Sequence, residues 1–235
     1  MSIFLWPRDL FRTRSSRFYI APHSRSFESP LNRASLHDRL GGERWVAELE
    51  TVTMDEPTWR QLAAFLSRLD GPTGKVLLGP YLTGGYTGAR GVGIYDPTGA
   101  SVPFSDDAPF SDDSTFAEGA GAGQLAVIAT RGDSSIAIAG MTASVTAVEP
   151  GDLLQLGDPY DAGCQLLEVV ARANSNASGT ARVEVRPRLR IDYPAGTPVT
   201  FVDPRGIFRL ADDGQTGIDR TVITASHALR FVEVV

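Results

Sequence analysis

Residues 181–186 read Ala-Arg-Val-Glu-Val-Arg, and this stretch decides the class of fold. Its apolar residues alternate with charged ones. A period of two places the two sets on opposite faces of a β-strand. Val183 and Val185 are therefore expected to face a core, and the charged side chains to face outward.

Similar short runs lie on both sides of this strand. They occupy residues 124–129, 135–139, 153–156, 165–170, 199–202, 207–210 and 229–235. Turn residues separate them at intervals of about 8 to 15 residues, which is typical of a β-barrel or β-sandwich. The polar run at 174–179 predicts a hairpin tip. The second half of the chain is therefore expected to be all β.

The first part of the chain predicts a β-hairpin followed by a helix. Two strand-like runs between residues 35 and 52 flank Leu-Gly-Gly-Glu at 40–43, where glycine supplies the positive φ of a tight turn. A helix is expected at 57–70, with Asp55 or Glu56 as its cap. Its apolar stripe consists of Trp59, Leu62, Ala63, Leu66 and Leu69. The helix is expected to pack on a sheet.

Composition indicates a folded, soluble protein. The 235 residues are 42% hydrophobic and 21% charged, which fits one large domain or two small ones. No apolar run reaches the roughly 20 residues of a membrane helix, and no signal peptide is recognisable, so no membrane partner and no secretion are expected. Cys164 is the single cysteine, which excludes an intrachain disulfide and a cysteine-based zinc site.

Charge is unevenly distributed along the chain. The formal net charge is −6, and the chain lacks the basic stripe that nucleic-acid binding needs. Residues 1–44 hold eight arginines and four acidic residues, whereas residues 91–130 hold six acidic residues and no basic one. Two interpretations stay open: two solvated surfaces, or a contact between the basic region of one copy and the acidic segment of another.

Two sets of arginines are candidates for an interface. One set, Arg12, Arg14, Arg17 and Arg25, lies in the N-terminal arm. The other set, Arg182, Arg186, Arg188 and Arg190, is dense for a strand face that meets only water. Arginine suits rigid contacts with carboxylates across an interface, so we favour an interface over a solvated face for the second set.

The long Gly- and Asp-rich segment at 89–122 contains a duplicated motif. Pro-Phe-Ser-Asp-Asp occurs at 103–107 and again at 109–113. The aspartates Asp106, Asp107, Asp112 and Asp113 are a weak candidate for a calcium site, because hard cations prefer clustered carboxylates. Their spacing matches no known calcium loop, and a flexible acidic loop is the favoured interpretation.

No pattern predicts catalysis or a cofactor. His23, His37 and His227 lie far apart in the sequence and lack metal-ligand spacing. Residues 71–75 read Gly-Pro-Thr-Gly-Lys, but a phosphate-binding loop needs a longer spacing and a following Ser or Thr where this chain has Val76. No nucleophile elbow or dinucleotide fingerprint is present. The chain is therefore expected to be neither an enzyme nor a cofactor-binding protein.

The order of motifs resembles the distal and minor tail-tip proteins of long-tailed, siphovirus-like bacteriophages. A basic arm, a glycine-turn hairpin with Arg-Trp at 44–45 and one helix opening with Pro-Thr-Trp-Arg-Gln-Leu come first. The second half then reads Pro-Gly-Asp-Leu-Leu-Gln-Leu at 150–156, Gln-Leu-Leu-Glu-Val-Val at 165–170, Asn-Ala-Ser-Gly at 176–179 and Arg-Pro-Arg-Leu-Arg at 186–190. Runs at 206–210 and 229–234 are similar to the final strands of that family, so the resemblance covers most of the chain.

The resemblance implies a two-domain structural protein. Such proteins form a ring, commonly a hexamer, at the end of the tail tube, and join the tube to the hub or baseplate. Residues 1–88 correspond to a ring-forming β-sandwich domain with an arm and one helix, and 123–207 to a peripheral barrel of OB-like or galectin-like type. Residues 208–235 are closing strands that are open to assignment to the first domain. The long acidic loop departs from the family pattern.

The resemblance also implies the partners and the location. The partners are further copies of the chain, the tail-tube protein and hub proteins, with the tape-measure protein or DNA passing through the lumen unbound. The location is the virion tail tip, assembled in the host cytoplasm. Residues 11–30 are expected to be poorly ordered in a single copy and ordered in the assembly. The alternative function is a receptor- or carbohydrate-binding tail-tip module.

Overall fold

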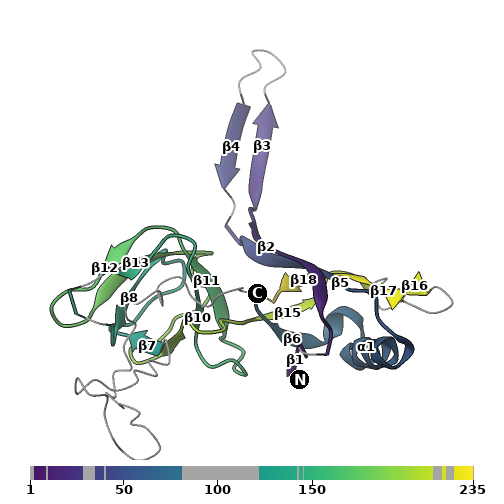
Figure 1. Cartoon of the computed structure of the whole chain (residues 1–235). Helices are drawn as coiled ribbons and strands as arrows, with labels where there is room; N and C mark the ends of the chain where they lie inside the picture. Colours follow the sequence, from purple (N-terminus) through teal and green to yellow (C-terminus); the bar gives the residue numbers. More distant parts are fainter. Residues whose placement is uncertain are drawn as a thin grey trace, which may run out of the picture. The chain divides into compact units, whose positions relative to one another are not determined.

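The structure is a computed structural model that describes residues 3–8, 10–28, 35–39, 41–80, 122–141, 143–144, 146–213, 219–220 and 225–234. It is mainly β, as predicted, with one α-helix among these residues (Figure 1). The chain divides into two compact units. One comprises Met1–Pro80 and Ile207–Val235, and the other comprises Tyr81–Gly206. The closing strands therefore belong to the first unit.

The first unit, here the sheet unit, contains a six-stranded sheet. Its strand order is β1 (Ile3–Leu5), β6 (Lys75–Leu78), β15 (Gly206–Leu210), β18 (Ala228–Glu233), β5 (Arg44–Thr51) and β2 (Thr13–Ala21). β1 runs parallel to β6, whereas β18 is antiparallel to both β15 and β5, and β2 is antiparallel to β5. Strands from both ends of the chain interleave, so the sheet is complete only when residues 206–233 have joined it.

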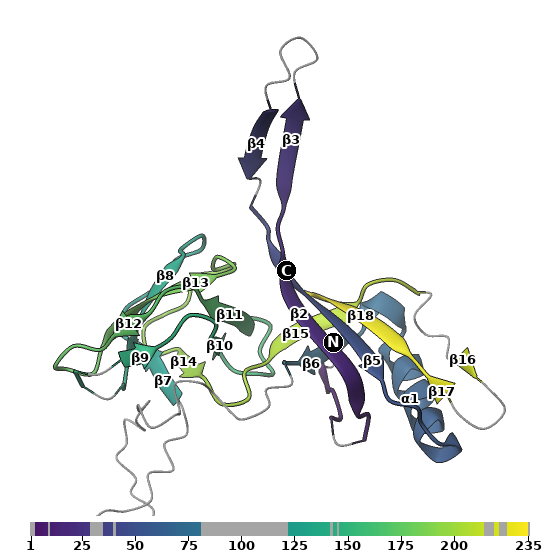
Figure 2. The ribbon, with the colours of Figure 1, turned by 45° about the horizontal axis from the view of Figure 1, so that its top comes forward.

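The helix α1 (Glu56–Leu69) covers one face of this sheet (Figure 2). The carboxylate of Asp55 accepts a hydrogen bond from the Thr58 amide at 3.3 Å and so caps the helix. Asp70, in the left-handed conformation at φ +52°, ends it, and a short 3₁₀ helix η1 (Gly71–Thr73) follows. The buried helix residues are Leu62, Leu66 and Leu69, three members of the predicted stripe.

An aromatic cluster joins the helix to the sheet. The Phe65 ring of the helix lies 5.6 Å from the Trp6 ring and 6.0 Å from the Phe11 ring. Trp6 in turn lies 5.7 Å from Phe231 on β18. These edge-on contacts hold strands from both ends of the chain against one helix.

The predicted hairpin between residues 35 and 52 is wrong. β4 (Ser35–Arg39) pairs instead with β3 (Ser24–Glu28), and β5 pairs with β2 and β18. Ala21 pairs with Arg44, and Ser24 pairs with Arg39. The link from β2 to β3 is therefore two residues long and the link from β4 to β5 is four residues long, which forms a bulge between the two pairs of strands. The positive φ values of Gly41 and Gly42, +69° and +78°, serve this bulge and not a chain reversal. The product is a two-stranded ribbon of β3 and β4 (Figures 1 and 2).

The expectation of a poorly ordered arm is also wrong for most of its length. Thr13–Ala21 is paired with β5 from Thr13 opposite Thr51 to Ala21 opposite Arg44. The reason is that apolar residues alternate within the arginine-rich sequence. Phe18 stands opposite Ala47, and its ring lies 6.1 Å from the Phe208 ring in the sheet unit's core.

The second unit, here the barrel unit, contains a closed barrel. Its strands follow the order β10 (Leu153–Leu156), β11 (Gln165–Val169), β13 (Ala181–Arg186), β8 (Ser135–Ala139), β7 (Ala122–Leu125) and β14 (Pro198–Thr200), and β14 pairs back onto β10. β8, β10 and β13 have the predicted bounds. The short strands β9 (Thr146–Val148) and β12 (Ala173–Asn174), which the sequence did not predict, form a separate pair. A further short pair, β16 (Asp219–Arg220) and β17 (Ala225–Ser226), lies in the sheet unit.

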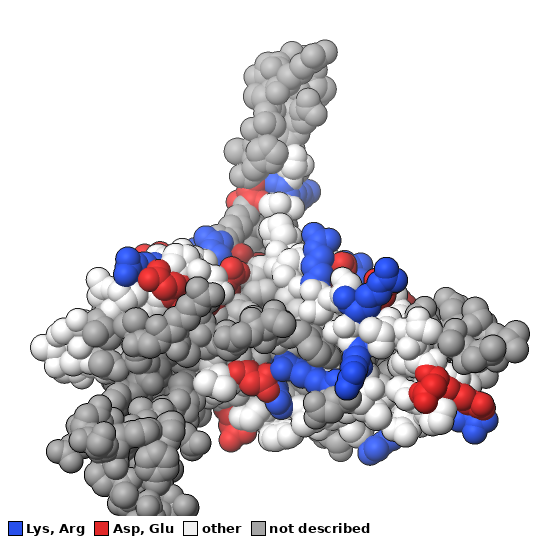
Figure 3. All heavy atoms as spheres, viewed as in Figure 1, with Lys and Arg blue, Asp and Glu red and all other residues white. Residues whose placement is uncertain are grey.

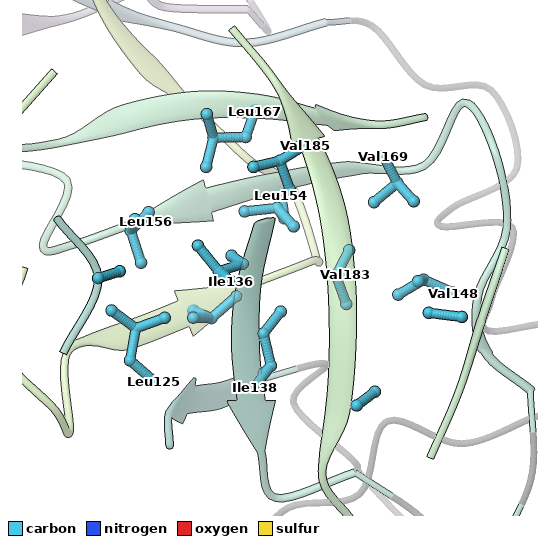
Figure 4. Close-up of a cluster of buried hydrophobic side chains, with 14 of the residues drawn as sticks. Leu125, Ile136, Ile138, Val148, Leu154, Leu156, Leu167, Val169, Val183 and Val185 are labelled. Atoms are coloured by element: carbon cyan, nitrogen blue, oxygen red, sulfur yellow. The ribbon is translucent and has the colours of Figure 1, made fainter. Parts of the chain in front are cut away.

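The barrel core is formed by the inward residues of its alternating strands. Figure 4 shows leucine, isoleucine and valine side chains converging from several strands, among them Leu154, Val183 and Val185, which are fully buried. Every second residue of β13 is buried, which confirms the predicted alternation. At the predicted hairpin tip, the Asn176 Oδ1 atom accepts hydrogen bonds from the amides of Ser178 and Thr180 at 3.0 and 2.9 Å.

Candidate functional site: an interaction surface

The strand β2 forms one edge of the open sheet. Among the described residues, only β5 pairs with it, so its outer side presents backbone N–H and C=O groups. Arg12, Arg14 and Arg17 are exposed on or next to this strand, and Arg25 is exposed on β3. The structure thus brings three of the four predicted arm arginines to one sheet edge and places the fourth on the ribbon.

Glu48 is the centre of a charged cluster on this part of the sheet. It lies directly opposite Arg17 on β2 and Arg230 on β18 in the strand register. Its carboxylate oxygens lie 3.8 Å from Arg17 Nη1 and 3.7 Å from Arg230 Nε. The Tyr19 hydroxyl donates a hydrogen bond to Glu48 Oε1 at 3.1 Å, and the Arg17 guanidinium lies 4.8 Å from the centre of the Tyr19 ring.

This cluster borders a shallow groove of about 440 Å³. The groove is lined by Ser15, Arg17, Glu48, Leu49, Glu50, Ala228, Leu229 and Arg230. Two carboxylates, those of Glu48 and Glu50, and two guanidinium groups, those of Arg17 and Arg230, lie in this lining. Each exposed pair contributes only about 0.2–1 kcal/mol to stability, so the cluster is better suited to recognition than to holding the fold. Figure 3 shows basic and acidic side chains in blue and red on this unit.

Arg12 and Arg14 differ from Arg17 in their surroundings. Within the described part of the chain, neither of them forms an ion pair with an acidic side chain. They extend the positive charge of the edge beyond the Glu48 cluster. The basic edge, defined as Arg12, Arg14 and Arg17 with strand β2, therefore carries three exposed arginines within six residues.

The barrel arginines are less uniform than the sequence predicts. Arg182 and Arg186 point outward from β13, and the Arg182 guanidinium donates hydrogen bonds to the Ser135 hydroxyl at 3.1 and 3.2 Å. Arg188 donates to the Gly132 carbonyl at 3.3 Å. Arg190 is only partly exposed, and its amide donates to the buried side chain of Gln165. Arg182, Arg186 and Arg188 thus lie exposed on the surface of the barrel, whereas Arg190 is partly buried.

A second groove, of about 270 Å³, lies beside Arg182. The exposed side chains of Val127 and Ile128 form its apolar part. Asp133 accepts hydrogen bonds from the Thr130 amide and hydroxyl at 2.8 and 3.0 Å, and these bonds, aided by the charge of Arg182, lower the pKa of Asp133. The groove therefore combines an apolar wall with a fixed pair of opposite charges.

The described residues offer little for catalysis. They contain no group of three or more histidine, cysteine or acidic side chains placed to hold a metal ion. His23 is hydrogen-bonded to the Gly41 carbonyl, and the backbone of His227 is bonded to Thr51, so each has a structural contact. Burial raises the pKa of Glu168, which stands opposite Arg186 in the register of β11 and β13. Asp106, Asp107, Asp112 and Asp113 lie outside the described residues.

The aromatic residues bear on the alternative of glycan binding. Tyr193, Phe201, Phe208 and Phe231 are buried in the cores, whereas Tyr160 is 58% exposed. A glycan site needs several aromatic or polar groups converging on one exposed surface. Among the described residues of the barrel unit, one exposed tyrosine does not provide such a surface.

The comparisons with known proteins add no family assignment. A scan against models of protein families and a search of curated protein sequences found no match. In the described part of the chain, no helix has the length and apolar character to cross a membrane.

The sequence did not predict Glu48, Tyr19 and Arg230 as members of a common site. Glu48 and Arg230 lie 182 positions apart in the sequence and meet only because β18 pairs with β5. Strand register across such a separation leaves no local signal in a single sequence. Glu48 alternates with apolar residues in the sequence, and this pattern indicates that its side chain lies on the outer face of the sheet. It does not indicate which side chains of the neighbouring strands lie beside it.

Proposed function

We propose that this chain is a non-enzymatic structural component of a bacteriophage tail tip, a distal tail protein. In this proposal, copies of the chain form a hexameric ring that joins the tail tube to the hub or baseplate. The observation that carries the proposal is the open sheet with a long basic edge in one unit, combined with a closed barrel in the other. The resemblance likewise implies two parts, a ring-forming domain and a peripheral barrel.

The open sheet supports self-assembly on physical grounds. A ring needs a heterologous contact, in which one surface of a subunit meets a different surface of its neighbour. An open sheet has two different edges, here β2 and β1, and an unpaired edge binds a neighbouring chain through its backbone. The ribbon of β3 and β4 supports the same proposal, because an isolated two-stranded ribbon is marginally stable in water and gains from a partner.

The test is the size of the purified chain, alone and mixed with a bacteriophage tail-tube protein. Mass photometry and negative-stain electron microscopy are expected to reveal closed rings in at least one of these samples. A chain that stays monomeric in both samples would overturn the proposal. Binding of the monomer to a glycan array would then favour the receptor-binding alternative.

A further inference from the structure

We propose that the basic edge of one copy binds the acidic segment at residues 96–118 of a second copy. This inference rests on the proposed function, because it names the two surfaces that meet when copies associate. The segment lies outside the described residues, and only its composition enters the argument.

The length of the edge favours a chain segment as the partner. β2 has nine residues, whereas β1 at the other edge has three. Nine residues extend over about 30 Å, and the register with β5 is continuous from Ser15 to Ala21. This part of the edge is long enough for an added strand to form several backbone hydrogen bonds. A small anion would leave most of this length unused.

The charge of the edge requires an acidic partner. Arg12, Arg14 and Arg17 lie within six residues, and the side chain of Arg17 is 72% exposed although it contacts Glu48. A strand paired beside them brings its own side chains within direct reach, so opposite charges stabilise the pair and like charges destabilise it. Glu48 is already shared between Arg17 and Arg230, and the neighbouring groove holds one further carboxylate, that of Glu50. The three edge arginines and Arg230 therefore outnumber these two carboxylates.

The chain itself carries a segment with the required charge. Residues 96–118 contain Asp96, Asp106, Asp107, Asp112, Asp113 and Glu118, and no basic residue. Several acidic residues elsewhere are paired with arginines: Glu56 with Arg60, Glu149 with Arg172 and Asp203 with Arg205. The segment 96–118 is therefore the strongest acidic counterpart to the basic edge in this sequence.

A contact between copies follows from the need for two unlike surfaces. When the basic edge of one copy binds the acidic segment of a second copy, the acidic segment of the first copy is still available. It can bind the basic edge of a third copy, and this repetition is the head-to-tail pattern of a ring. Deleting residues 1–30 would not test this contact, because it removes β1 and β2 from the sheet. Substitutions of exposed side chains are needed.

The first experiment is a charge swap in the full chain. Arg12→Glu with Arg14→Glu is expected to weaken self-association at least about tenfold, and added Asp106→Arg with Asp107→Arg to restore it. Arg17 is left unchanged because it contacts Glu48. The matched control, Arg68→Glu with Arg209→Glu, makes the same charge change at exposed arginines of the sheet unit and is expected to associate normally. Normal association of the Arg12/Arg14 variant, or no restoration by the swap, would overturn the inference.

The second experiment separates this inference from the proposed function. A fluorescent peptide of residues 96–118 is expected to bind the full chain, to bind the Arg12/Arg14 variant at least about tenfold more weakly, and to lose binding when its acidic residues become amides. Peptide binding without ring formation would overturn the proposed function alone. Rings that neither bind nor respond to the peptide would overturn this inference alone.

A cysteine trap decides between a second copy and the same copy. Ser15→Cys and Ser111→Cys are placed in separate, differently tagged chains, which are mixed and oxidised. Disulfide-linked pairs carrying both tags are expected. Cross-linking only when both substitutions are in one chain would place the contact within a copy and overturn the proposal.

Discussion

The two units deal with the edges of their strands in opposite ways. The barrel closes, because β14 pairs with both β7 and β10, and so removes its edges. The sheet stays open and ends in β1 on one side and the arginine-bearing β2 on the other. Among the described residues, the barrel thus leaves no strand edge unpaired within its ring of strands, whereas the sheet leaves two.

The units differ in chain continuity as well. The barrel uses one continuous segment that ends at Gly206, whereas the sheet unit needs both Met1–Pro80 and Ile207–Val235. The barrel is thus an insertion between β6 and β15. We expect each unit to unfold with its own transition, and this expectation gives four ways to test the comparison.

The largest effect is expected from Phe231→Ala in the sheet unit. Phe231 is fully buried against Trp6, and its truncation leaves a cavity that costs about 3–5 kcal/mol. All three tryptophans, Trp6, Trp45 and Trp59, lie in the sheet unit, so tryptophan fluorescence follows this unit in urea while far-ultraviolet circular dichroism follows both.

The control for Phe231→Ala is Leu10→Ala, which truncates a side chain that is 40% exposed. It is expected to change stability by less than about 1 kcal/mol. The barrel transition is expected to stay in place in both variants. An equal shift of both transitions would show that the two units unfold together.

The next effect is expected from Gly179→Ala in the barrel unit. Gly179 has φ +70°, and an added Cβ would lie 2.2 Å from the Met141 carbonyl oxygen, which belongs to the backbone and cannot rotate away. Strain and displacement together are expected to cost about 3 kcal/mol. Circular dichroism is expected to report the loss, with the tryptophan transition unchanged.

Gly196→Ala is the matched control for this substitution. Gly196 has φ +82°, but nothing lies within 4 Å of its added Cβ. Only the left-handed backbone penalty of about 1 kcal/mol then applies. Equal losses for both variants would mean that the backbone near Met141 relaxes to make room for the added methyl group.

A smaller effect is expected from Asp55→Ala at the start of the helix. Hydrogen bonds from Thr58 lower the pKa of Asp55, so its carboxylate stabilises the folded sheet unit above the pKa of the unfolded chain. This contribution is lost as the pH falls through the folded pKa. The variant is therefore expected to melt slightly below wild type at pH 7, with a smaller difference at pH 2.5.

Asp55→Asn controls for charge at this position, because asparagine also caps helices well. Its melting temperature at pH 7 is expected to lie closer to that of wild type than to that of Asp55→Ala. Thermal melts followed by tryptophan fluorescence provide the measurement. A difference between Asp55→Ala and wild type that is equally large at pH 7 and pH 2.5 would contradict the role of the carboxylate.

The barrel was more predictable from the sequence than the sheet unit. β13 alternates strictly, and β8, β10 and β13 were located by pattern and turn residues, which are local signals. In the sheet unit, the pairing of β5 with β18 joins residues that are far apart in the chain. Gly41 and Gly42 were correctly predicted to have positive φ. Because glycine with positive φ occurs both in bulges and in hairpin turns, the sequence did not distinguish between the two.

The candidate site shows the same limit. The sequence indicated that Arg12, Arg14 and Arg17 are exposed. Their place on or next to a paired edge strand depended on Phe18 packing against the core. The cluster at Glu48 depended on strand register on both of its sides. Neither property is encoded within a window of neighbouring residues.

The smallest effect is expected from Glu168→Gln on β11 of the barrel. Burial raises the pKa of Glu168, so the folded state binds the proton more readily than the unfolded chain. Below the pKa of the unfolded chain, near pH 4, Glu168 is protonated in both states and its burial has no charge penalty. As the pH rises through the folded pKa, the side chain must ionise while partly buried, which lowers the stability of the folded state. Glutamine keeps the shape without the charge, so the variant is expected to be more stable at pH 7, by less than about 1 kcal/mol.

Circular dichroism melts at pH 4 and pH 7 test this difference, with Glu184→Gln on the exposed side of β13 as the control. The gain of Glu168→Gln is expected at pH 7 and not at pH 4, and the control is expected to change little at either pH. The competing influence is Arg186, which stands opposite Glu168 in the register of β11 and β13. A loss of stability at pH 7 would mean that the attraction between Glu168 and Arg186 outweighs the cost of burying the charge. An ion pair with an arginine would then stabilise the outer face of the barrel, as the contacts of Glu48 with Arg17 and Arg230 do in the sheet.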